Sequence, residues 1–447
     1  MSLTISERKQ MMLERKKKEG GQMNNVSNGV LFSDGLSQEI KECFYYVDND
    51  PILGERLFFA NAGGSFRLKK AVDTFARIDS IPDYPGLIHE RARYLEKVQE
   101  DGLNDIRIIL NAKAGSILTT LTASQAMFDM VRAIAENVSG TNMVTSILEH
   151  PSAYDSMEYY AEKLKKEFRV AKSNPVTGGV DVDELIKLVD KDTCLLSVMY
   201  ASNISGAIFD IETIVKKARA IKPDLYIIVD AVQHTPHSVI DLQKIPVDGI
   251  NFAPYKFFGC RGLGIAWLSE RAAVLPHHKM TAKGANVWDL GSPAISQFAV
   301  VTEIVNYVCW IGGKFINSND RRELFAYGME RIALHERALM ARMLNGTDEI
   351  PGLRNIKGVK VFLDYEDLTK RDFIIAMGFD HLGYEQAVQE YDKKGVIVYE
   401  RLTSSPYSKR MLDSFKLDGA LRIAPLHCHS VADIDKFLIA TMELSRL

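Results

Sequence analysis

Short apolar runs alternate with amphipathic stretches from about residue 57 onward. The runs are rich in Val, Ile and Leu without polar alternation, which is typical of strands covered on both faces. The stretches between them predict helices; residues 124–138, for example, place Met127, Met130 and Ile134 on one side. This alternation over about 200 residues predicts a largely parallel α/β sheet. The expected strands are RLFFANA, 116–122, 142–148, 168–173, 193–200, 225–232, 249–255 and 262–269.

The pattern changes near residue 290. Two long helical stretches, 296–315 and 321–345, precede a smaller α+β segment. We place a domain boundary near 320–345 and predict strands near 359–365, 395–401 and 420–426 and a closing helix over 432–447. Residues 37–50 predict a short helix with aromatic anchors. The basic run MLERKKKEGG before it is interpreted as a solvated surface segment.

The composition agrees with an ordinary globular protein of 447 residues, 46% hydrophobic and 25% charged. With 55 basic and 58 acidic residues, a preference for nucleic acid does not follow. We find no apolar run near the roughly 18 residues of a membrane span. The charged N-terminus does not resemble a secretory signal. The five cysteines are widely spaced, without metal-ligand spacing, so we expect a reducing compartment, the cytoplasm, and no metal site.

Polar residues at the ends of the predicted strands are the candidates for chemistry, because parallel α/β sheets bind ligands at the carboxyl ends of their strands. Asp230 ends LYIIVD, where a carboxylate is costly unless it is paired; it either holds a buried cationic nitrogen or caps a helix. Lys256 follows an apolar strand among aromatic residues. Burial would make it a neutral, nucleophilic amine, although a lysine that reaches solvent at the strand edge fits as well.

Three further strand ends carry weaker signals. Thr122-Ala123-Ser124 precedes a helix and offers free N–H groups to a phosphate, or is a simple N-cap. His150 can stack on a planar ring or move a proton, but a lone His is more often structural. Asn203 can donate to an oxyanion or cap a turn.

The order of these signals resembles the class V aminotransferase family, which depends on pyridoxal 5'-phosphate (PLP) and includes cysteine desulfurases, selenocysteine lyases and kynureninase. The matching stretches are FFANAGG, TASQA, EHPSAY, NISGAIFDI, VDAVQHTPHSVIDLQKIPVDGINFAPYK, GCRGLGIAWL, LGSPA and ALRIAPLHCHSVADIDKFL. The resemblance implies an α/β fold of PLP fold type I, with a mostly parallel seven-stranded sheet. The implied parts are a leader and segment packing on the small domain (1–56), a large PLP-binding domain (57–325) and a small C-terminal domain (326–447).

The resemblance also implies the roles of residues. Lys256 would carry PLP, Asp230 would pair with its ring nitrogen, and His150 would stack on the ring. The implied catalytic residues are Lys256, His150 and Asp230; the cofactor-binding residues are these three with Ala123, Ser124, Asn203, Gln233, Tyr255 and Ser292; and the substrate-binding residues are Arg422, for the α-carboxylate, and Asn61. Ser292 would reach the phosphate of the other subunit in a homodimer.

Two departures from the family pattern bear on the reaction. Tyr255 precedes the lysine, where many members have His. Kynureninase-type members also have Tyr at this position. The loop before Arg422, YERLTSSPYSKRMLDSFKLDGALR, contains no Cys, although the desulfurase persulfide Cys belongs there. We therefore expect lyase or aminotransferase chemistry on a small α-amino acid through an external aldimine. Alternatives are a cysteine desulfurase proper, an amino-acid racemase or epimerase, and a silent PLP-fold scaffold. A nucleotide enzyme is disfavoured, because GxGxxG and GxxxxGK[ST] are absent.

Overall fold

A seven-stranded sheet forms the centre of the protein, whose computed structural model describes residues 27–82 and 85–447. The strand order is β4-β10-β9-β8-β7-β5-β6, and β10 is antiparallel to both of its neighbours while the other pairs are parallel. The predicted mostly parallel α/β sheet is confirmed. The strands are β4 (Ser116–Thr120), β5 (Asn142–Ser146), β6 (Glu167–Ala171), β7 (Thr193–Met199), β8 (Tyr226–Asp230), β9 (Gly249–Phe252) and β10 (Gly264–Leu268).

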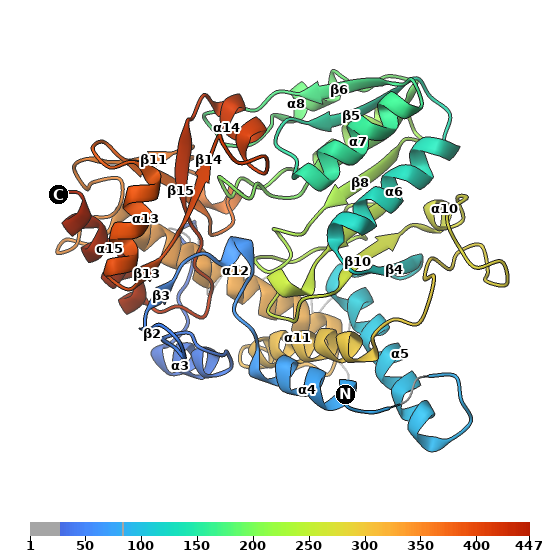
Figure 1. Cartoon of the computed structure of the whole chain (residues 1–447), viewed down its shortest axis with the longest axis horizontal. Helices are drawn as coiled ribbons and strands as arrows, with labels where there is room; N and C mark the ends of the chain where they lie inside the picture. Colours follow the sequence, from blue (N-terminus) through green and yellow to red (C-terminus); the bar gives the residue numbers. More distant parts are fainter. Residues whose placement is uncertain (1–26, 83–84) are drawn as a thin grey trace, which may run out of the picture.

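Helices cover both faces of this sheet, which explains the apolar runs without alternation (Figure 1). On β8, Ile228 packs in one core with residues of α6 and α7, whereas Ile227 and Val229 pack in the other core with residues of α9 and α11. Helices of the large domain are α4 (Lys69–Asp79), α5 (Glu90–Leu110), α6 (Ala123–Asn137), α7 (Pro151–Lys163), α8 (Val182–Ile186), α9 (Ile211–Ile221), α10 (Glu270–Ala273) and α11 (Ile295–Gly313), with the 3-10 turns η2 (Asn61–Gly63) and η3 (Pro254–Lys256).

A second, antiparallel sheet of order β11-β12-β15-β14 forms the C-terminal part. Helix α12 (Arg321–Asn345) leads into it and runs through residue 325, where the sequence placed the end of the large domain. The elements of the C-terminal part after α12 are β11 (Val359–Phe362), η4 (Leu368–Lys370), β12 (Ile375–Phe379), α13 (Tyr384–Lys393), β13 (Val396–Ile397), β14 (Tyr399–Leu402), α14 (Lys409–Phe415), β15 (Gly419–Ile423) and α15 (Val431–Leu444).

The two faces of this smaller sheet have different neighbours. Leu421 and Ile423 of β15 pack into the core of the small domain, together with residues of α13 and α15. Ala420 belongs to the core that it shares with the large domain, and so does Ala376 of β12, which pairs with Arg422. Because side chains alternate along a strand, Arg422 lies on the face that is turned toward the large domain.

The segment before residue 60 lies beside the small domain (Figure 1). RLFFANA, which we predicted as a strand, contributes only β3 (Leu57–Phe58), and β3 pairs in parallel with β13 rather than joining the large sheet. The helix predicted over 37–50 is α3 (Asp34–Glu42), followed by the hairpin β1 (Asn49–Asp50) and β2 (Gly54–Glu55). The basic run at 12–21 lies outside the described residues.

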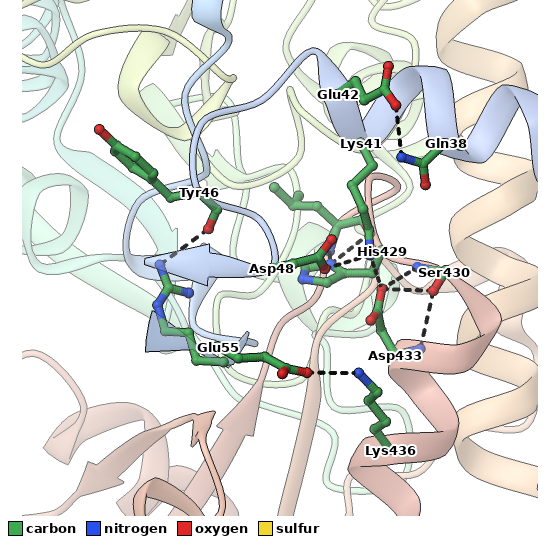
Figure 2. Close-up of polar contacts among 12 residues, drawn as sticks. Gln38, Lys41, Glu42, Tyr46, Asp48, Glu55, His429, Ser430, Asp433 and Lys436 are labelled. Carbon is green, nitrogen blue, oxygen red and sulfur yellow. Dashed lines mark hydrogen bonds and ion pairs between the residues drawn. The ribbon is translucent and has the colours of Figure 1, made fainter. Parts of the chain in front are cut away.

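Ion pairs join this N-terminal segment to the last helix (Figure 2). Lys41 of α3 lies 2.9 Å from Asp433 and 2.7 Å from Asp48, and Glu55 lies 3.3 Å from Lys436. Asp433 also caps α15, because its carboxylate accepts from Ser430 while its own N–H donates back to the Ser430 hydroxyl. One carboxylate therefore both starts α15 and binds α3.

Helix α11 corrects one expectation from the sequence. Among the described residues it is the one helix long and apolar enough to cross a membrane, with a mean hydropathy of 1.3 over 18 of its residues, although we had found no run of that length. However, 72% of that stretch is buried inside the protein, as in a core helix. Its neighbours are α4, α5 and α12.

Candidate functional site

A cavity of about 370 Å³ opens at the carboxyl ends of the large-sheet strands, where such sheets bind ligands. Its size is that of a small-molecule site. Eight of the residues singled out from the sequence line it, namely Ala123, Ser124, His150, Asn203, Asp230, Gln233, Tyr255 and Lys256. Segments that lie far apart in the chain are thus brought together around one cavity.

Lys256 ends the 3-10 turn η3 just after β9, so its amine is held at the cavity wall. The amine lies 3.4 Å from the amide oxygen of Gln233. Burial, and then the positive charge of Arg422, lowers its pKa from 10.5 to about 8. About a tenth of this amine is therefore neutral and nucleophilic at pH 7, far more than for an exposed lysine.

Asp230 is the last residue of β8 and also faces the cavity. One carboxylate oxygen accepts a hydrogen bond from the Val232 N–H at 3.0 Å. Burial raises its pKa, an effect opposed by the Val232 hydrogen bond and by the charge of Lys256. A buried carboxylate with so few donors has capacity left to bind a cationic nitrogen.

The N-terminus of α6 forms another wall of the cavity. The Thr122 hydroxyl accepts from the Gln125 N–H and caps the helix, which leaves the N–H groups of Ala123 and Ser124 without a partner in the described chain. Gly264 of β10 lies against this turn so closely that an added Cβ would stand 2.1 Å from the carbonyl carbon of Thr122. Two free donors at a helix start suit an anion such as a phosphate.

His150 caps α7 and has a defined tautomer. Its Nδ1 accepts from the Ser152 N–H at 3.2 Å, and the Ser152 hydroxyl lies 2.7 Å from the same atom. Because Nδ1 is an acceptor, a neutral ring carries its proton on Nε2. Burial, and then the charge of Lys256, lowers the pKa of His150 to about 3, so the ring is neutral at physiological pH.

Arg422 lies next to the cavity without lining it. Its guanidinium donates to the carbonyl of Asn203, a cavity residue, at 3.2 Å. Burial, and then the neighbouring Arg401, lowers the pKa of Arg422 to about 9. The side-chain oxygen of Asn203 is buried and has no partner among the residues that the structure describes.

Two residues from the sequence set lie outside the cavity. Asn61 uses its amide within the fold: it donates to the carbonyls of Phe58 and Ala424 and accepts from the Phe66 N–H. Ser292 is exposed in the segment before α11. Its predicted role in the site of a second subunit stays a prediction, as does the substrate-binding role of Asn61.

None of the five cysteines lines the cavity, and all five lie in the described residues. Burial is the first cause of a raised pKa at every one of these thiols, including Cys260, four residues after Lys256. The turn between β14 and α14, residues 403–408, holds Tyr407, whose ring lies 6.3 Å from that of His150. A thiolate nucleophile is therefore missing from this site.

Sequence reasoning missed several residues of the site. Ser152 lines the cavity and orients His150, and its position two residues after His150, before a helix, is the signal that could have indicated it. Arg261 also lines the cavity and stands 4.3 Å from the centre of the Tyr255 ring. Arg401 was read as an ordinary strand residue, since nothing local shows that it is buried.

Known proteins resemble this chain in sequence. Cysteine desulfurase IscS of Buchnera aphidicola (strain 5A) is 29% identical over 213 residues, which are 47% of this chain and 52% of that protein. The chain thus matches about half the length of that relative. A probable cysteine desulfurase of Borreliella burgdorferi is 22% identical over 444 residues, 90% of this chain and 96% of that protein.

Solved structures share the fold. The apo cysteine desulfurase of Thermococcus onnurineus NA1 gives a TM-score of 0.76 at 17% identity, with 92% of this chain and 98% of that chain covered. Cysteine desulfurase CsdA of Escherichia coli gives 0.75 at 16% identity and covers 94% and 100%. The sequence model of the family described as aminotransferase class-V matches residues 85–437. With that match across most of its length, the chain belongs to the class V aminotransferase family.

Proposed function

We propose that this protein is a PLP-dependent enzyme that acts on a small α-amino acid by lyase or aminotransferase chemistry. The observation that carries the proposal is the partly neutral amine of Lys256, in a cavity that also holds a sparsely hydrogen-bonded carboxylate, Asp230. The family is PLP-dependent. The free N–H groups of Ala123 and Ser124 offer a phosphate site at the start of α6. The donor set therefore fits the cofactor.

Each side chain has a separate task in this proposal. Asp230 would hold a proton on the ring nitrogen, and Asn203 and Gln233 would bond the phenolic oxygen. PLP, when bound, supplies an electron sink for charge that develops at the α-carbon of the substrate. Lys256 would attach the cofactor and, once released, remove the α-proton, for which a pKa of about 8 is well suited.

Two further residues would act on the substrate. Arg422 would bind its carboxylate through a planar pair of donors. His150 presents an Nε2–H, because Ser152 occupies Nδ1, and so would donate a hydrogen bond from a neutral ring. A homodimer, in which Ser292 completes the neighbouring site, is part of the proposal. So is a reducing compartment, the cytoplasm, in keeping with five free cysteines.

Cofactor binding is tested on the purified protein. We expect an absorbance band in the visible range and, after borohydride treatment, a cofactor-labelled peptide that contains Lys256. Lys256→Ala should abolish the label, whereas Lys97→Ala, which changes an exposed lysine of α5, should leave it intact. A protein that stays colourless with added PLP would contradict the proposal. If amino acids changed the spectrum but no product formed, a scaffold role would replace it.

A cysteine desulfurase is the second candidate, because relatives carry that name. None of the five cysteines lines the cavity, which argues against it, since sulfur transfer through an enzyme persulfide needs a thiolate near the cofactor. We expect cysteine and a reductant to release no sulfide at an enzymatic rate. Rapid release that is lost in Cys260→Ala or Cys428→Ala would show that one of these thiols is used.

A further inference from the structure

Two arginines lie on the same face of the small sheet. Arg422 of β15 pairs with Tyr399 of β14, and Arg401 pairs with Ala420, so Tyr399, Arg401 and Arg422 point to the side that faces the large domain. The guanidinium carbon of Arg422 lies 5.3 Å from the centre of the Tyr399 ring, and that of Arg401 lies 5.8 Å from it. Both cations therefore share one aromatic neighbour.

Both arginines are buried, with relative exposures of 7% for Arg401 and 3% for Arg422. Within residues 27–82 and 85–447, neither forms an ion pair with a carboxylate. Arg401 donates to the Tyr407 carbonyl at 2.8 Å and Arg422 to the Asn203 carbonyl, while the Nε of each has no partner in the described part of the chain. Arg371, which is equally buried, has Asp364 at 3.1 Å. Two buried cations without an anion are costly to fold.

The two arginines lie near different parts of the cavity wall. Asn203, which Arg422 holds, lines it, and Tyr407, which Arg401 holds, lies against His150 of its wall. The positive charges of Arg401 and Arg422 both lower the pKa of the Lys256 amine, because they repel its protonated form. Asp230 lines the cavity, and the proposed function already assigns it to a cationic ring nitrogen. The small-domain side of the cavity thus carries two positive charges that no carboxylate of the described residues pairs.

We propose that the substrate is an α-amino acid with a second acidic group on its side chain, such as a carboxylate or a sulfinate. Arg422 binds one acidic group and Arg401 binds the other. This inference rests on the proposed function and narrows its substrate class. An amino acid with a neutral side chain would satisfy one guanidinium and leave the second one buried without an anion. A diacid neutralises both, and each planar guanidinium matches a two-oxygen acid group.

The test uses the PLP-loaded protein. L-aspartate and L-glutamate are titrated against their amides, L-asparagine and L-glutamine, with the cofactor spectrum as the readout. The acids should bind at least about 30-fold more tightly than the amides, because an amide leaves a buried charge unpaired. Calorimetry with maleate, an unreactive dicarboxylate, gives a second readout that requires no turnover; maleate should bind and isocrotonate, which has a methyl group in place of one carboxylate, should not.

Variants of Arg401 test whether this residue binds the acidic group of the substrate side chain. Arg401→Gln should remove the preference for acids over amides, and Arg401→Lys should restore part of it. The matched control is Arg342→Gln, since Arg342 pairs with Asp435 within the small domain at 2.7 Å, away from the cavity; it should bind acids like the unaltered protein. If Arg401→Gln does not fold, Arg401→Lys and the maleate titration decide the matter.

The outcomes separate this inference from the proposed function. Amides that perturb the spectrum as well as the acids do, with no binding of maleate, would overturn the diacid and leave the PLP enzyme standing. An unchanged preference in Arg401→Gln would overturn the role of Arg401. A spectrum that responds to no amino acid would instead count against the proposed function itself.

Discussion

Lys256 should weaken the fold of the cofactor-free protein at neutral pH. Its pKa of about 8, against 10.5 in an unfolded chain, means that burial disfavours the ammonium form. A tenfold change in a proton equilibrium corresponds to about 1.4 kcal/mol, so this form is destabilised by about 3 kcal/mol in the folded state. Lys256→Met removes the charge with little change in volume and should raise the free energy of unfolding by a similar amount at pH 7.

The sign of the pH dependence follows from the same two values. Below pH 8 Lys256 is protonated in both the folded and the unfolded chain, so the buried ammonium destabilises the fold by the full amount. Between pH 8 and 10.5 only the unfolded chain keeps this proton. The free energy of unfolding therefore rises with pH until the destabilisation by the ammonium has disappeared. The advantage of Lys256→Met should therefore be largest at pH 7 and vanish by about pH 10.5.

Urea denaturation of both proteins at pH 7 and pH 10, after removal of cofactor with hydroxylamine, measures this difference. Lys97→Met is the control: Lys97 is exposed and paired with Asp101, so it should give no gain. A Lys256→Met protein no more stable than the parent at pH 7, or a gain that is equal at both pH values, would refute a buried, cationic lysine.

Three more changes test other parts of the site. Asp230→Asn should lower activity roughly tenfold to a hundredfold, the worth of one charge-assisted hydrogen bond, while cofactor still binds; unchanged turnover would remove Asp230 from the chemistry. Glu149 is buried and burial raises its pKa to about 8, so the folded protein holds a proton that the unfolded chain loses above 4.5, and stability falls as pH rises from 4.5 to 8. Glu149→Gln should flatten that slope in denaturant titrations across this range, and an unaltered slope would assign it to other groups. Gly264→Ala should abolish cofactor binding, followed by absorbance, because its Cβ would meet the Thr122 backbone at 2.1 Å; normal binding would show that the turn can move.

Local patterns were enough to predict most of the large sheet. A strand covered on both faces is apolar at every position, and β7, with all seven residues buried, is such a strand. The same reasoning could not predict the reversed direction of β10, since an apolar run does not encode its direction. It also missed α4 and α5, whose apolar stripes lie among many charged residues.

The site was predictable where a residue ends an apolar strand or closely follows one, as Asp230 and Lys256 do. Arg401 was not, because it stands in a strand next to Glu400 and looks like a solvent-facing residue. Its burial is produced by the large domain, which covers that face of the small sheet. Asn61 shows what a motif cannot reveal: its amide donates to two backbone carbonyls and accepts from one backbone N–H, and its substrate-binding role stays a prediction.

The raised pKa of all five thiols has a practical consequence. Alkylating reagents and mild oxidants attack thiolates, so the native chain should tolerate both at neutral pH. A cysteine introduced at Ser405, in the turn that also holds Tyr407 beside His150, would then react against a background of protonated thiols. An introduced thiol can therefore be studied in this chain without interference from the native cysteines and without a change to the cavity.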